Sequence, residues 1–399
     1  MNRAAEKQQG HEIRIGIDYT AAVRQRAGIG RYTRNLVRAL ADIDAESRYT
    51  LFVAGGPGDD GLGLWPANFR VRSIPLSDRW LQILWQRMRL PVPIQAVTGP
   101  LDLFHSPDFV LPPVGSTPAI LTIHDLSFMR VPECFVPGFR SYLEKAVSRG
   151  VRRAGRILAD SENTRHDLIE LLGVEPGRVV VLYPGVESRF EPVCDADVLD
   201  QVRARYRLPD HFILGLGTLQ PRKNFVGLIE AFAQLLAHSQ DVCRNLRLVI
   251  VGGEGWLAED IPAAVARLGL EERVRLVGFV EDVDLPALYS LASVFAFPSL
   301  YEGFGLPVLE AMACGTPVVA ADNSSLPEAA GNAGLLVPAK APPALAKALE
   351  SLLTDSSLRD QMVAAGLKQA RKFTWPKSAQ QLLSLYARSS SSWQGHEFA

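Results

Sequence analysis

The sequence predicts an α/β protein made of two doubly wound domains that face each other across a cleft. Short apolar runs rich in β-branched residues alternate with amphipathic helical stretches, a pattern typical of parallel sheets covered by helices on both faces. This alternation occurs twice along the chain, with a polar stretch between the two series. The length of 399 residues also fits two or three domains rather than one.

The first series of strands and helices occupies residues 11–188 and begins with the apolar run I-R-I-G-I-D. A glycine-bearing turn and an amphipathic helix, Y-T-R-N-L-V-R-A-L, follow this run. Short β-branched runs of this kind are typical of buried parallel strands. Further strands are expected at 49–53, 101–105, 119–123, 156–159 and 179–182, with helices at 139–152 and 164–172.

The second series covers residues 210–375 and repeats the same alternation. Residues 189–209 are polar, contain no obvious strand, and are predicted to link the two domains. A last helix at 376–387 precedes the serine-rich stretch 388–399, which we expect to be a mobile tail. The strands of the second domain are expected in F-I-L-G-L-G, L-R-L-V-I-V-G, V-R-L-V-G-F, S-V-F-A-F, P-V-V-A-A and G-L-L-V.

The composition excludes several classes of protein. Lys and Arg number 42 and Asp and Glu 43, so the net charge of −1 lacks the basic excess of bulk nucleic-acid binders. The four cysteines are far apart with no C-x-x-C pair, so reduced thiols are expected rather than a zinc site or a disulfide framework. The N-terminus lacks a secretory signal, and no apolar stretch approaches the roughly 20 residues of a spanning helix. We therefore expect a cytoplasmic protein.

The most informative motif is Y-E-G-F-G-L-P-V-L-E-A-M-A-C-G-T-P-V-V, residues 301–319, which follows the strand S-V-F-A-F. Pro307 suits the first turn of a helix, and the glycines before it leave backbone N–H groups exposed at the positive end of that helix. Such an N-terminus is a natural seat for a phosphate. Glu302 and Glu310 bracket the seat and are placed to accept hydrogen bonds from ligand hydroxyls. The alternative is a plain turn in which Glu310 only favours the helix dipole.

Three further turns carry candidate ligand contacts. L-G-T-L-Q-P-R-K-N-F places Arg222 and Lys223 after a second-domain strand. Two cations at this position are able to neutralise a diphosphate, and each charge-assisted contact contributes roughly 1.5–3 kcal/mol to binding. The alternative is a solvated charge pair. R-A-G-I-G-R-Y-T-R-N contains Gly28 and Gly30 but not the third glycine of a dinucleotide fingerprint, so it is a phosphate-reaching loop or a tight turn. L-T-I-H-D-L-S-F ends a first-domain strand with His124, which donates to a leaving phosphate or sugar hydroxyl, or is a satisfied polar residue.

The remaining signals are weaker. V-G-F-V-E-D, residues 277–282, offers backbone groups to a nucleobase or is an ordinary strand end. R-W-L-Q-I-L-W-Q-R-M-R-L, residues 79–90, fits a half-buried helix whose arginines reach solvent, with contact to a membrane or lipid-linked acceptor as the alternative. His105 is placed like His124 but with less support. The chain contains no metalloprotease, P-loop or convincing Asp-x-Asp motif, so no metal is expected.

Together these motifs resemble those of glycosyltransferase family four, the large retaining family of group 1 enzymes with two Rossmann-like domains (the GT-B fold). E-G-F-G-L-P-V-L-E matches the family's Glu-x7-Glu motif at Glu302 and Glu310, and P-R-K-N and V-G-F-V match in order and spacing. The resemblance covers nearly the whole chain, from the turn at Gly28 through the last helix. It implies that this helix packs back on the first domain.

The resemblance also implies roles for individual residues. Glu302 and His124 are the implied catalytic residues at the donor sugar, and no residue is identified as a covalent nucleophile. The resemblance implies that Glu310 binds the ribose of the donor and that its phosphates are bound by Arg222, Lys223 and Gly30. It implies that the sugar and the diphosphate contact the amides of Phe304, Gly305 and Leu306. The base is expected to contact the backbone of Phe279 and Val280.

The predicted reaction is a retaining transfer of a hexose from a nucleotide sugar to a hydroxyl of a saccharide or lipid-linked acceptor, without a cofactor. GDP-mannose is the first choice of donor, because H-D-L-S-F and T-L-x-P-R-K-N look like those of bacterial mannosyltransferases in polysaccharide assembly, and UDP-glucose is the second. The alternatives are a nucleotide-sugar epimerase of the same architecture, a sugar-nucleotide-binding regulator without catalysis and, with least support, a nicotinamide dehydrogenase. No nucleic-acid partner is expected, and the enzyme is placed in the cytoplasm or peripherally on the inner face of the membrane.

Overall fold

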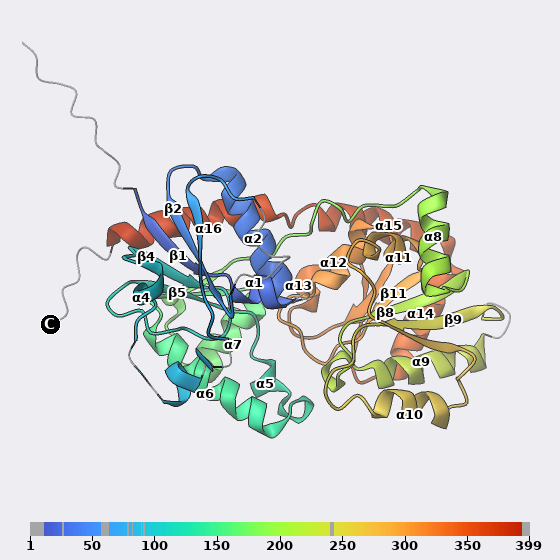
Figure 1. Ribbon diagram of the computed structural model, residues 1–399. Helices are drawn as coiled ribbons and strands as arrows, with labels where there is room; N and C mark the ends of the chain where they lie inside the picture. Colours follow the sequence, from blue (N-terminus) through green and yellow to red (C-terminus); the bar gives the residue numbers. More distant parts are fainter. Residues whose placement is uncertain are drawn as a thin grey trace, which may run out of the picture.

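The computed structural model describes residues 12–392 except 26–27, 57–63, 78–79, 82, 89, 91 and 240–242. Two domains lie side by side, and each is built on one sheet with helices packed on its two faces (Figure 1). Every strand pair within the two sheets is parallel. The predicted fold class, two doubly wound α/β domains, is confirmed.

The first sheet has seven strands in the order β3-β2-β1-β4-β5-β6-β7. The chain starts in the middle of the sheet, runs to one edge through β2 and β3, and then returns to β4 beside β1. Its strands are β1 (Arg14–Asp18), β2 (Arg48–Ala54), β3 (Phe69–Ile74), β4 (Leu103–Ser106), β5 (Ala119–Ile123), β6 (Arg156–Ala159) and β7 (Val179–Val181). Its helices are α1 (Thr20–Arg24), α2 (Ile29–Ile43), α4 (Gln95–Thr98), α5 (Ser127–Arg130), α6 (Pro137–Arg153) and α7 (Glu162–Leu172), with short helical turns η2 (Pro132–Cys134) and η3 (Pro176–Arg178).

The second sheet has six strands in the order β10-β9-β8-β11-β12-β13. Helix α8 lies within the segment predicted as a linker, where Asp195 caps its first turn and Val202 is buried in the second-domain core. The strands are β8 (His211–Leu216), β9 (Leu246–Val251), β10 (Val274–Gly278), β11 (Val294–Phe297), β12 (Val318–Ala321) and β13 (Leu335–Val337). The helices are α8 (Ala196–Tyr206), α9 (Phe225–His238), α10 (Asp260–Arg267), α11 (Leu285–Leu291), α12 (Leu306–Ala313), α13 (Leu326–Ala330), α14 (Pro342–Thr354) and α15 (Ser356–Ala370), with η4 (Pro221–Lys223).

The strand order places a binding region in each domain. The chain reverses direction along the sheet between β1 and β4 in the first domain, and between β8 and β11 in the second. Doubly wound sheets bind ligands at such switch points, beyond the carboxyl ends of the strands. The turns after these four strands carry the Gly28 turn, Asp108, the Arg222–Lys223 pair and the Glu302 loop.

The last helix, α16 (Trp375–Ser392), leaves the second domain and lies against α2 of the first (Figure 1). Trp375, Leu382 and Tyr386 are buried in a first-domain core cluster. Helix α16 continues beyond its predicted end at residue 387, through the buried Ser389, into the stretch predicted as a mobile tail. The rest of that tail, residues 393–399, lies outside the described residues.

The segment 79–90 is described in part. It contains a short π-helical turn, η1 (Ile83–Arg87), and the side chains of Trp80 and Met88 are 57% and 59% exposed. The side chains of its three arginines lie outside the described residues, so their contact with solvent or with a membrane stays a prediction. Within the described parts of the chain, we find no helix with the length and apolar character needed to span a membrane.

Candidate active site

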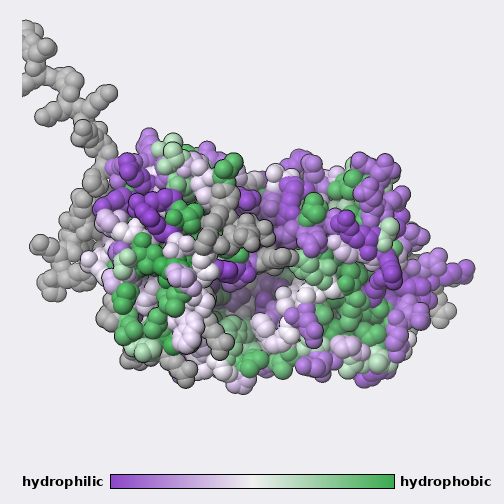
Figure 2. All heavy atoms as spheres, viewed as in Figure 1, coloured by the Kyte–Doolittle hydropathy of each residue, from purple (hydrophilic) through white to green (hydrophobic). Residues whose placement is uncertain are grey.

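A cavity of about 610 Å³ lies between the two domains, and Figure 2 shows the molecule hollowed there. The first domain lines it with turns that follow β1, β4, β5 and β6, and the second with turns that follow β8, β9 and β11. The two switch points therefore open into one shared space. Its charged lining residues are Arg31, Asp108, His124, Asp125, Asp160, Arg222, Lys223, Glu302 and Glu310.

Glu302 and the two predicted cations form one buried ion-pair cluster. The Nζ atom of Lys223 lies 2.6 Å from Oε1 of Glu302, and Nη1 of Arg222 lies 2.8 Å from Oε2. Burial raises the pKa of Glu302, but the charges of Arg222 and Lys223 outweigh it and lower the pKa to about 2. The carboxylate is therefore ionised, and it holds both cations at the second-domain wall of the cavity.

The loop before α12 brings the second domain into close contact with the first. Gly305, with φ of +108°, ends the loop, and α12 begins at Leu306 with Pro307 in its first turn. The first N–H groups of a helix have no partner within it, and Phe304, Gly305 and Leu306 all line the cavity. A Cβ on Gly303 would lie 2.1 Å from the carbonyl oxygen of His124, so only glycine allows the two domains to meet here.

Glu310 is paired with a cation that the sequence analysis did not single out. Arg31, from α2 of the first domain, lies 2.7 Å from Glu310 and 2.6 Å from Glu187, and Tyr289 also donates to Glu310. Burial by itself lowers the pKa of Arg31, but Glu310 and Glu187 outweigh it and raise this pKa, so the guanidinium stays charged. The only sequence signal was the arginine that follows Gly30 in the glycine turn.

His124 is held by first-domain groups through both ring nitrogens. Nδ1 lies 2.7 Å from Oδ2 of Asp160, and Nε2 donates to the carbonyl oxygen of Pro107 at 3.0 Å. Burial lowers the pKa of His124, but the charge of Asp160 and its hydrogen bond outweigh burial and raise the pKa to about 9. The imidazole is thus a buried cation beside the cavity, with no N–H directed to a ligand in this conformation.

Three predicted donor contacts do not line the cavity. Phe279 is 47% exposed, Val280 is buried in the second-domain core, and neither is among the cavity residues. Gly30 lies within the first turn of α2, where a Cβ would come within 1.9 Å of the carbonyl oxygen of Gln25. Its neighbour Gly28, with φ of +56°, does line the cavity, so Gly28 is the better placed of the two glycines.

His105 has a structural role, as a buried polar residue with hydrogen-bond partners inside the protein. It is buried, and its ring nitrogens contact Tyr386 at 2.7 Å and Thr122 at 2.9 Å. Burial lowers its pKa to about 3, so the ring is neutral and links β4 to the terminal helix α16.

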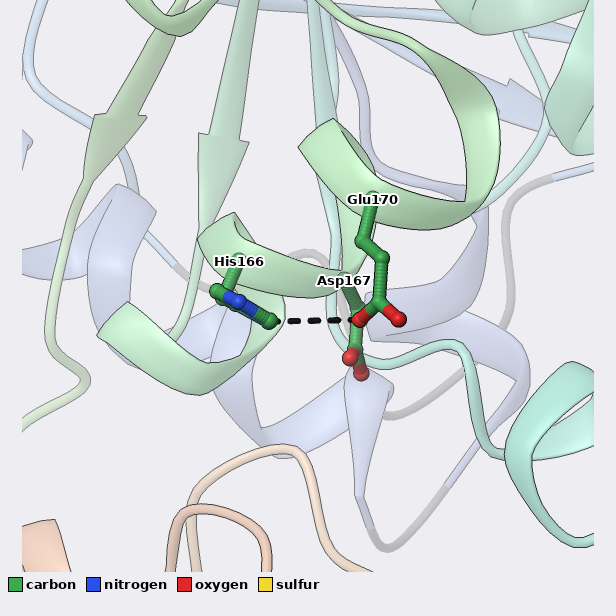
Figure 3. Close-up of side chains that lie close together, drawn as sticks. All are labelled: His166, Asp167 and Glu170. Atoms are coloured by element: carbon green, nitrogen blue, oxygen red, sulfur yellow. Dashed lines mark ion pairs between the residues drawn. The ribbon is translucent and has the colours of Figure 1, made fainter.

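One acidic group outside the cavity has the spacing of metal ligands. His166, Asp167 and Glu170 come together on α7, as Figure 3 shows. The guanidinium of Arg130 is ion-paired with both carboxylates, and Asp167 also accepts from Tyr301. These partners already satisfy the acids, so the group is part of an ion-pair network between α5, α7 and the Glu302 loop.

Comparison with known proteins agrees with this architecture. Residues 201–369 match the family model "Glycosyl transferases group 1", and residues 26–190 match "Glycosyltransferase Family 4". An O-antigen chain mannosyltransferase B from Escherichia coli is 36% identical over 369 residues, which is 90% of this chain and 95% of that protein. A D-inositol 3-phosphate glycosyltransferase from Salinispora tropica is 33% identical over 72% of this chain and 64% of its own length.

Solved structures share the fold. A sucrose-phosphate synthase from Thermosynechococcus elongatus superposes with a TM-score of 0.73 at 23% identity, over 96% of this chain and all of that one. WaaG, a glycosyltransferase of lipopolysaccharide biosynthesis, superposes with a TM-score of 0.68 at 17% identity, over 94% of this chain and 99% of that one. With both halves matched by family models and one relative aligned over nearly its whole length, the chain belongs to the family 4, group 1 glycosyltransferases.

Proposed function

We propose that this glycosyltransferase transfers mannose from GDP-mannose, with retention, to a hydroxyl of a saccharide or lipid-linked acceptor in polysaccharide assembly. The observation that carries the choice of sugar is the 36% identity to an O-antigen chain mannosyltransferase over 95% of that protein. The mannosyltransferase WbdA from Escherichia coli is also similar, at 33% identity, although this chain spans only 32% of its length.

The second-domain wall of the cavity supports the chemistry of donor cleavage. Departure of a nucleoside diphosphate develops negative charge on the leaving phosphate and positive character on the sugar. Arg222, Lys223 and the N-terminus of α12 lie on one wall, where fixed cations and N–H groups stabilise that negative charge without reorganising. Glu302, which joins the two cations, is placed to orient them and to accept from hydroxyls of the sugar.

Retention is best explained by attack of the acceptor on the same face from which the diphosphate leaves. The pKa of Glu302 is low, and the carboxylate is occupied by two cations, which makes it a poor covalent nucleophile. Both nitrogens of His124 are already engaged, so the imidazole is not the base in this conformation. In attack on the same face, the departing phosphate lies beside the acceptor hydroxyl and accepts its proton.

Contacts between the domains support a reaction in a closed cleft. The carboxylate of Glu328 on α13 accepts from the backbone N–H groups of Glu162 and Asn163 at the start of α7, both at 2.8 Å. Together with the Arg31–Glu310 pair, these bonds hold the domains against each other. Closure of this kind excludes water and limits hydrolysis of the donor.

A thermal-shift panel of GDP-mannose, UDP-glucose and ADP-glucose tests the donor. A ligand that binds the native state raises the apparent unfolding temperature as its concentration increases, so GDP-mannose is expected to give the largest shift. A larger shift with UDP-glucose contradicts the choice of donor. Incubation of the preferred donor without acceptor distinguishes a transferase from an epimerase, because only an epimerase changes the sugar under that condition.

A further inference from the structure

The Glu302 loop is anchored to the first domain by a side chain that does not reach the cavity. Tyr301 immediately precedes Glu302, is 7% exposed and is not among the cavity residues. Its hydroxyl donates to the carboxylate of Asp167 and accepts from Nδ2 of Asn163 at 2.7 Å. Both partners belong to α7 of the first domain, and Figure 3 shows Asp167 on this helix. A residue next to Glu302 is therefore bonded across the two domains.

The two first-domain partners of this hydroxyl are themselves held in place. Asp167 is 2% exposed, and Nε of Arg130 donates to its second oxygen at 2.8 Å. The backbone N–H of Asn163 donates to Glu328 of α13 at 2.8 Å, so Asn163 contacts two second-domain elements, one through its main chain and one through its side chain. The position of the Tyr301 hydroxyl is therefore fixed by groups of the other domain.

The backbone of Tyr301 connects this anchor to a cation of the cavity. Nη1 of Arg222 donates to the carbonyl oxygen of Tyr301 at 2.6 Å and also lies 2.8 Å from Oε2 of Glu302. The N–H of Leu300 donates in turn to the carbonyl oxygen of Arg222 at 2.8 Å. A displacement of Tyr301 therefore displaces the carboxylate and the guanidinium together.

We infer that Tyr301 is a positioning residue for glycosyl transfer, because its hydroxyl ties the reactive arrangement of Glu302 and Arg222 to closure of the two domains. This inference rests on the proposed function. When the domains separate, the partners of the hydroxyl on α7 move away and the loop loses this constraint. The reactive arrangement is then complete only in the conformation that excludes water, which protects the donor from hydrolysis.

The domains are held together by other contacts as well, so the hydroxyl is not needed for docking alone. Gly303 meets the backbone of His124, and Glu328 accepts from two N–H groups in the first turn of α7. Removal of the hydroxyl would leave the Tyr301 ring and these contacts in place. What the hydroxyl adds is a fixed orientation of the loop, which is a catalytic rather than a packing requirement.

Transfer kinetics with the intact protein test the role of the hydroxyl. With GDP-mannose and methyl α-mannopyranoside, Tyr301→Phe is expected to lower kcat by about 10- to 100-fold, the rate equivalent of one charge-assisted hydrogen bond. The ratio of donor hydrolysis to transfer should rise by about fivefold, because water enters a cleft that closes less tightly. The Kd for GDP should stay within about threefold, since Lys223 and the start of α12 are unchanged.

Tyr49→Phe is the matched control. The buried hydroxyl of Tyr49 also donates to a carboxylate, that of Asp44 at 2.6 Å, but this bond lies within the first domain. Its kcat and its ratio of hydrolysis to transfer should stay at the wild-type values. An unchanged kcat in folded Tyr301→Phe protein, or an equal fall in Tyr49→Phe, overturns the inference alone. Wild-type protein that transfers no mannose overturns the proposed function and the inference with it.

A double-mutant cycle separates positioning from an independent structural role. Asn163→Ala removes one partner of the hydroxyl and keeps the backbone bond to Glu328. It is expected to lower kcat by about fivefold in the wild-type background and to have almost no effect in the Tyr301→Phe background, because groups that act through one bond are not additive. The same fold-change in both backgrounds overturns the inference.

Discussion

The carbonyl oxygen of His124 and the α-carbon of Gly303 are in direct van der Waals contact across the two domains, so close that a Cβ on Gly303 would lie 2.1 Å from that oxygen. Both atoms belong to the backbone, so no rotation of a side chain relieves the contact. The contact therefore sets how far the cleft closes around the Glu302 loop.

Replacement of Gly303 by alanine is expected to keep the cleft from closing fully. A displacement of about 1 Å between reacting groups costs roughly a hundredfold in rate, so kcat for transfer should fall by about that factor. Each domain should still fold, because the added methyl group meets the other domain rather than its own core. Steady-state transfer and circular dichroism together check this.

Gly177→Ala is the control for that variant. Gly177 lies on a first-domain turn, where the nearest atom to an added Cβ is 3.5 Å away, an ordinary contact distance. Its kcat should stay within twofold of the wild type. Equal activity of the Gly303 and Gly177 variants would contradict the role of the interdomain contact.

Arg31→Ala tests the buried pair between the first domain and α12. The side chains of Arg31 and Glu310 are 16% and 3% exposed, so the substitution leaves a buried carboxylate that accepts a side-chain hydrogen bond from Tyr289. A loss of about 3 kcal/mol in the free energy of unfolding is expected, measured by urea denaturation. Arg48→Ala, which breaks an exposed pair with Glu12, should have a much smaller effect on the free energy of unfolding. Similar small losses in both variants would show that the Arg31 pair contributes little.

The His124–Asp160 pair predicts a dependence of stability on alkaline pH. The pKa of His124 is about 9 in the folded protein, above its ordinary value of 6.5, because Asp160 stabilises the imidazolium against the cost of burial. Its contribution is therefore complete below about pH 6.5 and is lost as pH rises through 9, by up to about 3 kcal/mol. Urea unfolding at pH 6, 7.5 and 9 measures this loss.

Asp160→Asn keeps the shape of the side chain and removes its charge. In this variant the buried ring is expected to be neutral above pH 6.5, so stability should change little between pH 6.5 and 9. A wild-type decline that persists unchanged in the variant would assign the pH dependence to another group.

The periodicity of the sequence predicts most of this fold, and its failures are local. The strand β3 was not predicted, because F-R-V-R-S-I lies at the edge of its sheet and alternates charged with apolar residues instead of forming an apolar run. The terminal helix is longer than expected, since its last turns are serine-rich and depend on packing against α2 rather than on helix propensity.

The candidate site was predictable where it depends on one domain only. The Arg222–Lys223 turn and the Glu302 loop follow neighbouring strands β8 and β11, so topology alone brings them together. The partner of Glu310 was missed, because Arg31 reaches it from another domain and its position depends on how the two domains dock.

The central claim is that Lys223 and its neighbours hold the diphosphate of the donor, and calorimetric titration of the nucleoside diphosphate of the preferred donor tests it most directly. Lys347, exposed on α14, provides the control variant Lys347→Ala. A charged hydrogen bond contributes about 1.5–3 kcal/mol, so Lys223→Ala is predicted to raise the Kd by roughly 10- to 100-fold while Lys347→Ala leaves it unchanged. A Kd in folded Lys223→Ala protein equal to that of the wild type would contradict the account.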